Sequence, residues 1–242
     1  MPSTRNENDA LLIPAYNTAQ TMRPVLDAVS PFFRTIVVVD DGSTDDSAKI
    51  AADCGVVVLR HGVNKGKGAA LKTGFGYLHR RGVELIMTMD ADGQHSARDI
   101  PRLWLALEEQ DEEQAPWGIV IGSRFASREL IPPYRYYPNR CGQIILSGLT
   151  GQTLEDTQSG FRIYRTCVLQ QLVLHTDRFE TETEVIIKTA RLGYRILFVP
   201  IETIYPENER QKTNFKPILD TYRISIMVLR ELLSRFSQKV KP

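Results

Sequence analysis

The feature that most constrains the fold of this chain is a regular alternation of short apolar, β-branched runs with stretches of helical periodicity. Ile36–Val39 is continuously apolar and Leu85–Met89 is interrupted only by Thr88, a pattern typical of strands buried on both faces. This alternation predicts an α/β fold, a mostly parallel sheet with helices on both faces. The expected strands are Ala10–Pro14, Thr35–Asp40, Val56–Arg60, Glu84–Asp90, Gly118–Gly122 and Arg195–Val199.

Helical periodicity fills most of the chain between and after these strands. The segment Ile131–Pro138 is rich in proline and tyrosine and is predicted to be a loop. A chain of 242 residues can bury one large α/β core, so we expect a single domain over residues 1–214, then an amphipathic helix and tail over 215–242. The expected helices are Thr21–Ser30, Asp45–Cys54, Gly68–Arg81, Ala97–Glu113, Asn139–Thr150, Glu180–Leu192 and Phe215–Phe236.

Composition excludes several classes of protein. The net charge of +1 gives no support to a nucleic-acid binder, which usually carries a basic excess. Three scattered cysteines without a CxxC pair indicate neither a zinc ribbon nor a disulfide framework, and favour reduced thiols in a cytosolic compartment. No signal peptide and no long apolar run are present. We therefore expect a cytoplasmic protein that meets a membrane only at its surface, as a peripheral protein of the inner face.

Acidic residues follow the predicted strands where ligands bind in open α/β sheets, at the carboxyl ends. Asp90 and Asp92, spaced by one small residue, can both reach a hard divalent cation, and Gln94 can add a neutral oxygen. Such a cation would bind a nucleotide diphosphate. The alternative is an acidic turn before the next helix, with Ser96 as its N-cap.

Two further motifs accompany this pair. Asp40 and Asp41 either cap the helix that starts near Asp45 or accept hydrogen bonds from a nucleobase N–H and a ribose hydroxyl. The run Asn64–Gly68 opens a helix with glycines and lysines, which suits an anion, although its spacing is not that of a Walker loop. His95 is expected to be structural, because no second histidine or cysteine lies near it in the sequence.

In order and spacing, these motifs resemble family 2 glycosyltransferases, and within that family the polyprenyl-phosphate sugar synthases of the dolichol-phosphate mannose synthase type. The resemblance spans roughly Ala10 to Ile224. The motifs that carry it are Ile13–Asn17, Val39–Asp45, Asn64–Gly68, Asp90–His95, Gly122–Phe125, Asp156–Arg162, Phe179–Glu182, Ile204–Asn208 and Thr213–Phe215.

The resemblance implies a GT-A fold, a UDP- or GDP-sugar donor, Mg²⁺ or Mn²⁺, and a polyprenyl or dolichyl phosphate acceptor. It implies that the metal and diphosphate are held by Asp90, Asp92 and Gln94. It also implies that Arg124 and Arg140 face the acceptor phosphate, with Arg124 near the transferred sugar. On the donor side it implies roles for Pro14, Tyr16, Asn17, Asp40, Asp41, Lys67, Arg162 and Lys212.

The expected reaction is an inverting single displacement at the anomeric carbon. Processive members of the family carry Gln-x-x-Arg-Trp, whereas Gln158 here leads into Ser-Gly-Phe-Arg, so we expect transfer of one sugar. A phosphate acceptor needs positioning by arginines, while a hydroxyl acceptor needs a general base. Asp156 is the candidate base, and Glu182 is a weaker one. Two alternatives stay open, a saccharide or other hydroxyl acceptor and a nucleotide-sugar-binding protein without catalysis.

The predicted C-terminal helix carries one apolar stripe with basic residues on its flank. The basic residues are Lys216, Arg223 and Arg230. The helix can lie in a bilayer interface, pack on its own sheet, or pair with another subunit as a coiled coil. The stripe consists of Phe215, Leu219, Tyr222, Ile226, Leu229, Leu233 and Phe236.

Overall fold

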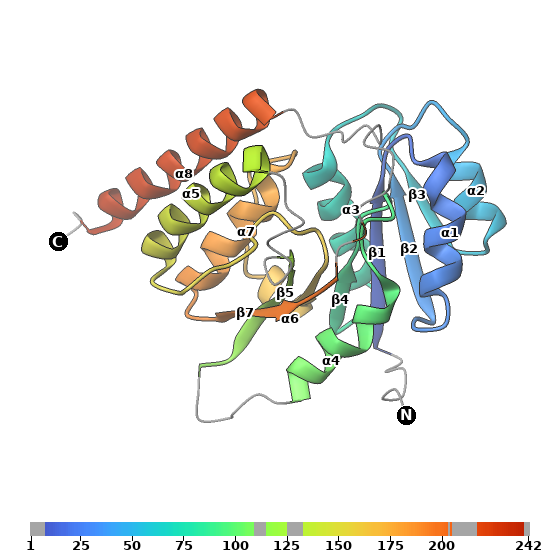
Figure 1. Ribbon diagram of the computed structural model, residues 1–242, viewed down its shortest axis with the longest axis horizontal. Coiled ribbons are helices and arrows are strands. Elements are labelled where there is room, and N and C mark those ends of the chain that lie inside the picture. Colours follow the sequence, from blue (N-terminus) through green and yellow to red (C-terminus); the bar gives the residue numbers. More distant parts are fainter. Residues whose placement is uncertain (1–7, 109–114, 125–132, 203, 205–216, 240–242) are drawn as a thin grey trace.

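The computed structural model describes residues 8–108, 115–124, 133–202, 204 and 217–239. Seven strands form one mostly parallel sheet in the order β3-β2-β1-β4-β6-β5-β7 (Figure 1). Only β6 runs antiparallel to its neighbours, β4 and β5. The strands are β1 (Asp9–Ala15), β2 (Thr35–Asp40), β3 (Val57–Arg60), β4 (Leu85–Thr88), β5 (Trp117–Ser123), β6 (Arg162–Arg165) and β7 (Arg195–Pro200).

Helices cover both faces of this sheet, as predicted, because successive residues of each central strand point to opposite faces. In β1, Leu11 and Ile13 pack with α1, α2 and α4, whereas Ala10 and Leu12 pack with α3, α5, α7 and α8. The helices are α1 (Ala19–Val29), α2 (Ser47–Asp53), α3 (Lys67–His79), η1 (Ala97–Asp99), α4 (Ile100–Glu108), α5 (Pro133–Thr150), α6 (Thr166–Leu169), α7 (Glu180–Arg191) and α8 (Pro217–Lys239).

The loop predicted for Ile131–Pro138 is wrong over residues 133–138, because α5 begins at Pro133. Proline is well suited to the first position of a helix, where its missing N–H would have no intrahelical partner. The helix predicted for Ala97–Glu113 begins as the 3₁₀ turn η1, capped by the side chain of Ser96, and continues as α4. Its last residues, like the expected domain boundary at 214, lie outside the described residues.

The strand β6 was not predicted, since its sequence Arg-Ile-Tyr-Arg begins and ends with a charged residue. It lies at the centre of the sheet, and its first residue, Arg162, is fully buried. The order β2, β1, β4 places the acidic ends of β2 and β4 on either side of the polar end of β1, at one edge of the sheet, as the sequence predicts. None of the described helices is both long enough and apolar enough to span a bilayer.

Candidate active site

The carboxyl end of β2 fixes a loop in front of α3. Asp41 accepts hydrogen bonds from the backbone N–H groups of Lys65 (3.0 Å) and Gly66 (2.7 Å). Its Oδ1 also lies 2.6 Å from Nδ1 of His61, a residue that the sequence did not single out. Gly66 has a φ of 109°, which favours glycine. Asp41 therefore holds the predicted anion-binding loop in place through its backbone, whichever ligand that loop binds.

Asp40 is fully buried beside it. Its Oδ1 accepts the N–H of Ser43 at 3.2 Å. Its Oδ2 lies 3.0 Å from Arg60 Nε without hydrogen-bond geometry, and no described residue donates to it. A buried acceptor without a donor suits the predicted contact with a nucleobase N–H, which stays a prediction. The alternative of capping α2 is wrong, because the N-cap residue of that helix is Asp46.

The end of β1 is joined to the turn after β2. Asn17 has a φ of 53°, its N–H donates to Ser43 Oγ (2.9 Å), and its Oδ1 accepts the N–H of Thr44 (2.9 Å). Pro14 is buried in β1, and Tyr16 is half-buried. These contacts bring the predicted base- and ribose-binding residues to one edge of the sheet.

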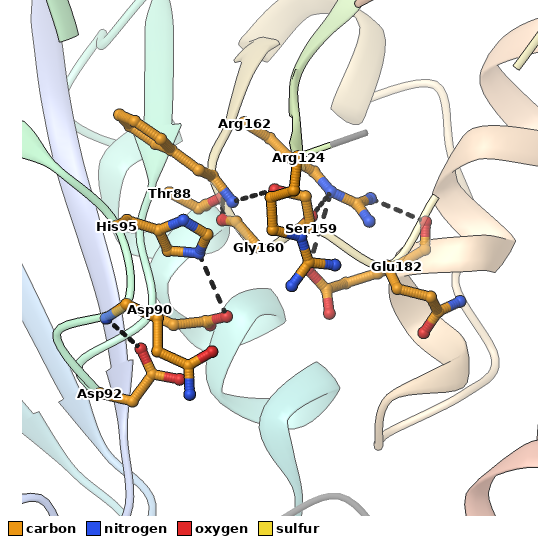
Figure 2. A network of polar contacts seen from close by, with 12 residues as sticks. Thr88, Asp90, Asp92, His95, Arg124, Ser159, Gly160, Arg162 and Glu182 are labelled. Carbon is orange, nitrogen blue, oxygen red and sulfur yellow. Dashed lines mark hydrogen bonds and ion pairs between the residues drawn. The ribbon is translucent and has the colours of Figure 1, made fainter. Parts of the chain in front are cut away.

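Asp90 and Asp92 follow β4 at the same edge (Figure 2). Asp92 Oδ1 accepts the backbone N–H of Gln94 at 3.0 Å, and His95 Nε2 lies 3.8 Å from Asp90 Oδ2. Gly160 approaches the Asp90 carboxylate so closely that a Cβ there would lie 2.3 Å from Oδ2. Thr88 holds Gly160 in place by donating to its carbonyl at 2.9 Å.

Lys67 joins the two sides of the site. Its Nζ lies 2.6 Å from Asp90 Oδ1 and 3.0 Å from Glu182 Oε2. Burial by itself would lower the pKa of Lys67, but the two carboxylates outweigh it and raise that pKa. Burial would likewise raise the pKa of Asp90, yet the Lys67 ammonium and His95 lower it. Asp90 and Lys67 are therefore both charged near neutral pH.

Asp92 differs from its neighbour. Burial first, and the charge of Asp90 second, raise the pKa of the Asp92 carboxyl. Two partly buried carboxylates thus lie close together, with one ammonium group in contact with only one of them. Additional positive charge between them would relieve this repulsion.

Arg124 and Asp156 form a second pair. Arg124 donates from Nε to Asp156 Oδ2 (2.6 Å) and from Nη2 to Oδ1 (2.9 Å), a bidentate arrangement. The Asp156 side chain is 1% exposed and that of Arg124 is 22% exposed. Burial would raise the pKa of Asp156, but the Arg124 charge and hydrogen bonds lower it. The buried Asp156 carboxylate therefore fixes the position of the Arg124 guanidinium, which still reaches solvent.

Arg162 belongs to the framework of the site. Its side chain is fully buried, and its nitrogens donate to backbone carbonyls of Thr157 (2.8 Å), Ser159 (2.7 Å) and Glu182 (3.0 Å). Arg162 has no exposed surface in this structure, and its hydrogen bonds tie the Gly160 segment to α7. The contact with the sugar donor that the resemblance implies for Arg162 stays a prediction.

The two remaining predicted residues lie apart from this network. Arg140 is exposed on α5, and its Nη1 donates to Gln143 Oε1 at 2.9 Å. Gln143 in turn donates to the carbonyl of Leu154, close to Asp156 in sequence. Lys212 lies outside the described residues.

Comparison with known proteins identifies the family. The family model described as Glycosyl transferase family 2 matches residues 10–173. This chain belongs to glycosyltransferase family 2. The UDP-N-acetylglucosamine–dolichyl-phosphate N-acetylglucosaminyltransferase of Methanococcus voltae is 30% identical over 223 residues, which cover 81% of this chain and 86% of that protein. The undecaprenyl-phosphate mannosyltransferase of Micrococcus luteus is 30% identical over 211 residues, covering 81% and 83% of the two chains.

A solved structure supports the same fold. Glucosyl-3-phosphoglycerate synthase from Mycobacterium tuberculosis, in complex with Mn²⁺, uridine diphosphate and phosphoglyceric acid, superimposes with a TM-score of 0.68 at 21% identity. The match covers 94% of this chain and 78% of that one. The predicted family and GT-A fold are confirmed, and the chain is a glycosyltransferase.

The acidic edge of this glycosyltransferase fits a divalent cation. No group of three or more histidine, cysteine, aspartate and glutamate side chains forms a metal cage among the described residues. A site with few protein carboxylates suits Mg²⁺ or Mn²⁺, because diphosphate oxygens and water complete the shell. The residues present fit such an ion, because Lys67 contacts the carboxylate of Asp90 but not that of Asp92.

Sequence reasoning missed several residues of the site or underrated them. Glu182, taken only as a weak candidate base, contacts Lys67. Thr88 and Gly160 shape the surroundings of Asp90. His95 is buried, as its structural reading implies, and its ring lies 5.4 Å from that of Phe161. The spacing of the two aspartates pointed to Asp90, but nothing local in sequence showed that Lys67 of α3 contacts both Asp90 and Glu182 of α7.

Proposed function

We propose that this glycosyltransferase moves one sugar, with inversion, from a UDP- or GDP-sugar to a polyprenyl or dolichyl phosphate, in a reaction that depends on Mg²⁺ or Mn²⁺. The two relatives named above support the acceptor class, since both carry a polyprenyl- or dolichyl-phosphate acceptor in their names. The M. tuberculosis complex supports a metal and a uridine nucleotide on this fold.

The observation that carries the acceptor class is the state of Asp156. Both of its oxygens are bonded to Arg124, and its pKa is lowered. A buried carboxylate in a bidentate ion pair is a poor general base. Glu182 is equally engaged with Lys67. A hydroxyl acceptor would need a base, whereas a phosphate monoester is already an anion near neutral pH. The site therefore suits a phosphate acceptor better.

In the proposed reaction an acceptor phosphate oxygen attacks the anomeric carbon, and the bond from that carbon to the diphosphate oxygen breaks. The leaving diphosphate keeps the electron pair. Asp90, Asp92 and the Gln94 amide would hold the cation, which when bound neutralises charge on the diphosphate. Arg124, fixed by Asp156, pairs with the acceptor phosphate, and Lys67 supplies positive charge beside the donor.

A lipid phosphate acceptor also implies work at a membrane surface. Arg140 would add a second guanidinium for the acceptor, and Lys212, outside the described residues, would contact the sugar donor. The resemblance of the motifs supports both roles, and neither depends on whether Asp156 can act as a general base.

The test is a donor panel of UDP- and GDP-sugars with Mn²⁺ and a short polyprenyl phosphate, scored by sugar label in the organic phase. We expect one donor to give an extractable product whose anomeric configuration, read by NMR, is inverted. The free polyprenol serves as the control and should stay unlabelled. Transfer to a soluble saccharide alone would show that the acceptor is a saccharide hydroxyl. Donor binding without any transfer would show a nucleotide-sugar-binding protein without catalysis.

A further inference from the structure

The C-terminal helix α8 exposes the more regular of its two apolar faces. Leu219, Tyr222, Leu229 and Leu233 are 41%, 61%, 55% and 60% exposed. They belong to the stripe that recurs at three- and four-residue steps. The helix instead packs on α7 through Met227 and Val228, which are 5% and 9% exposed. Packing of the predicted stripe on the chain's own sheet is therefore wrong.

A second helix that packs on α7 also carries exposed apolar residues. Ile144 and Ile145 of α5 are 62% and 51% exposed. Both α5 and α8 pack on α7, and Figure 1 draws them on the same side of the molecule. We call the six exposed residues the α5–α8 face: Ile144, Ile145, Leu219, Tyr222, Leu229 and Leu233. Large exposed apolar surfaces of this kind mark interaction sites.

The charges around the α5–α8 face are basic. Arg140 and Arg230 are exposed, and Arg223 is half-buried. Among the described side chains of α5 and α8, the acidic ones point inward. Asp220 is 2% exposed and accepts a hydrogen bond from Arg223 Nη1 at 3.1 Å, and Glu231 forms ion pairs with Lys188 and Arg191 of α7.

This charge pattern decides between two occupants. The three- and four-residue spacing would suit a coiled coil, in which charges flanking the apolar seam pair with opposite charges of the partner helix. Arg223 already pairs with Asp220 of its own helix, and a second copy would offer the exposed Arg230 no unengaged acidic partner among the described residues of α8. An anionic lipid surface complements both features, since apolar side chains enter the interface while arginines meet the headgroups.

We propose that the α5–α8 face docks this enzyme on an anionic membrane surface. This proposal rests on the proposed function and extends it. It names the membrane surface at which the enzyme would meet a lipid phosphate. Arg140, predicted to contact the acceptor phosphate, lies on α5 one turn before Ile144. Docking through α5 would thus bring the acceptor arginine to the headgroup level.

The experiment measures sedimentation of the full chain with phosphatidylcholine vesicles, with and without phosphatidylglycerol. We expect binding only to the anionic vesicles, weakened by salt. Leu229→Glu combined with Leu233→Glu should lower the bound fraction by about tenfold. Arg230→Glu, which keeps the apolar residues, should lower it less. Leu105→Glu is the matched control, because Leu105 is 51% exposed on α4, across the sheet, and it should bind like wild type.

Three outcomes would overturn the proposal. They are no binding of the wild-type chain to anionic vesicles, equal loss in Leu105→Glu, or a dimer in light scattering that Leu229→Glu with Leu233→Glu converts to monomer without affecting vesicle binding. Circular dichroism checks that each variant folds.

A water-soluble short-chain prenyl phosphate separates this proposal from the proposed function. The double variant should use it like wild type and lose activity only on long-chain acceptor in vesicles. If no variant transfers sugar but vesicle binding follows the pattern above, the docking surface stands and the acceptor assignment fails.

Discussion

At the scale of single residues, Lys67 connects the donor side of the site to α7. Its ammonium lies within 3.0 Å of both Asp90 and Glu182, and only 14% of its side chain is exposed. Because a buried charge is costly without a partner, the contacts with Asp90 and Glu182 stabilise the charged form of Lys67. A divalent cation at Asp90 would act on the same carboxylate, so Lys67 and the metal compete for it.

This competition predicts the behaviour of Lys67→Met. The variant leaves two buried carboxylates without their counter-charge, so we expect it to be destabilised by about 3 kcal/mol without metal. Added Mn²⁺ should raise its melting temperature more than it raises that of wild type. Lys72→Met, which removes a more exposed ion pair with Asp177, is the control and should respond like wild type. An equal or smaller Mn²⁺ effect in Lys67→Met would contradict the competition.

Asp92→Asn separates catalysis from stability. We expect turnover to fall by about a hundredfold or more, because a proposed metal ligand is lost. The metal-free protein should be at least as stable as wild type, since burial and Asp90 disfavour the Asp92 charge. Steady-state kinetics and thermal melts measure both quantities. Turnover close to wild type would remove the metal from the mechanism.

At the scale of elements, the segment between Asp156 and β6 places the backbone against Asp90. Its conformation is held by Thr88 from β4 and by Arg162 from β6. An antiparallel strand inserted between β4 and β5 makes this possible, because β6 begins at the edge where its parallel neighbours end. The geometry of the site thus depends on a strand with little sequence signal.

Gly160→Ala tests the close approach. Its Cβ would fall 2.3 Å from Asp90 Oδ2, so the carboxylate must move. We expect Mn²⁺ binding, followed by electron paramagnetic resonance, to weaken by about tenfold or more. Gly148→Ala is the control, because a Cβ at this α5 position meets nothing within 4 Å. That variant should be more stable by about 0.5–1 kcal/mol, with unchanged metal binding.

Arg162→Met tests the buried framework. The change removes the guanidinium that donates to three backbone carbonyls. We expect a loss of about 3–5 kcal/mol in the free energy of unfolding, measured by urea denaturation. Arg98→Met, at an exposed position, should change it by less than about 0.5 kcal/mol. A small change in the free energy of unfolding of Arg162→Met would contradict the positioning role and favour the predicted contact with the sugar donor.

At the scale of the whole molecule, the two ends of the sheet carry different electrostatics. The carboxyl edge pairs its buried carboxylates with Lys67 and Arg124. At the opposite edge, Asp9 begins β1, and its Oδ1 is buried without a hydrogen-bond partner among the described residues. Burial first, and Glu84 second, raise the pKa of Asp9 from 3.8 to about 6.

This raised pKa makes stability depend on pH. Ionising Asp9 costs more in the folded than in the unfolded state, so the cost is absent below pH 3.8 and complete above pH 6. Asp9→Asn should therefore match wild type near pH 4 and exceed it by about 1 kcal/mol at pH 8, a value reduced for partial exposure. Urea denaturation at both values measures this. An equal difference at the two pH values would rule out Asp9 ionisation as its cause.

The sequence by itself determined the layers of the molecule and the position of its acidic edge. Apolar runs such as Ile36–Val39 identify buried strands locally, and aspartates after β2 and β4 need only the direction of a parallel strand to meet. The resemblance carried by the motifs fixed the family, which the match over residues 10–173 confirmed.

Only the tertiary structure decided what each charged group contacts. Lys67 and Glu182, or Arg124 and Asp156, lie far apart in sequence, so their pairing follows from strand order and helix packing. The same holds for Arg162, whose burial depends on carbonyls supplied by other segments. In α8, periodicity revealed an apolar stripe, but packing of Met227 and Val228 on α7 decided that the stripe faces outward. Periodicity is a local property, whereas partners are chosen by residues that meet only in the folded chain.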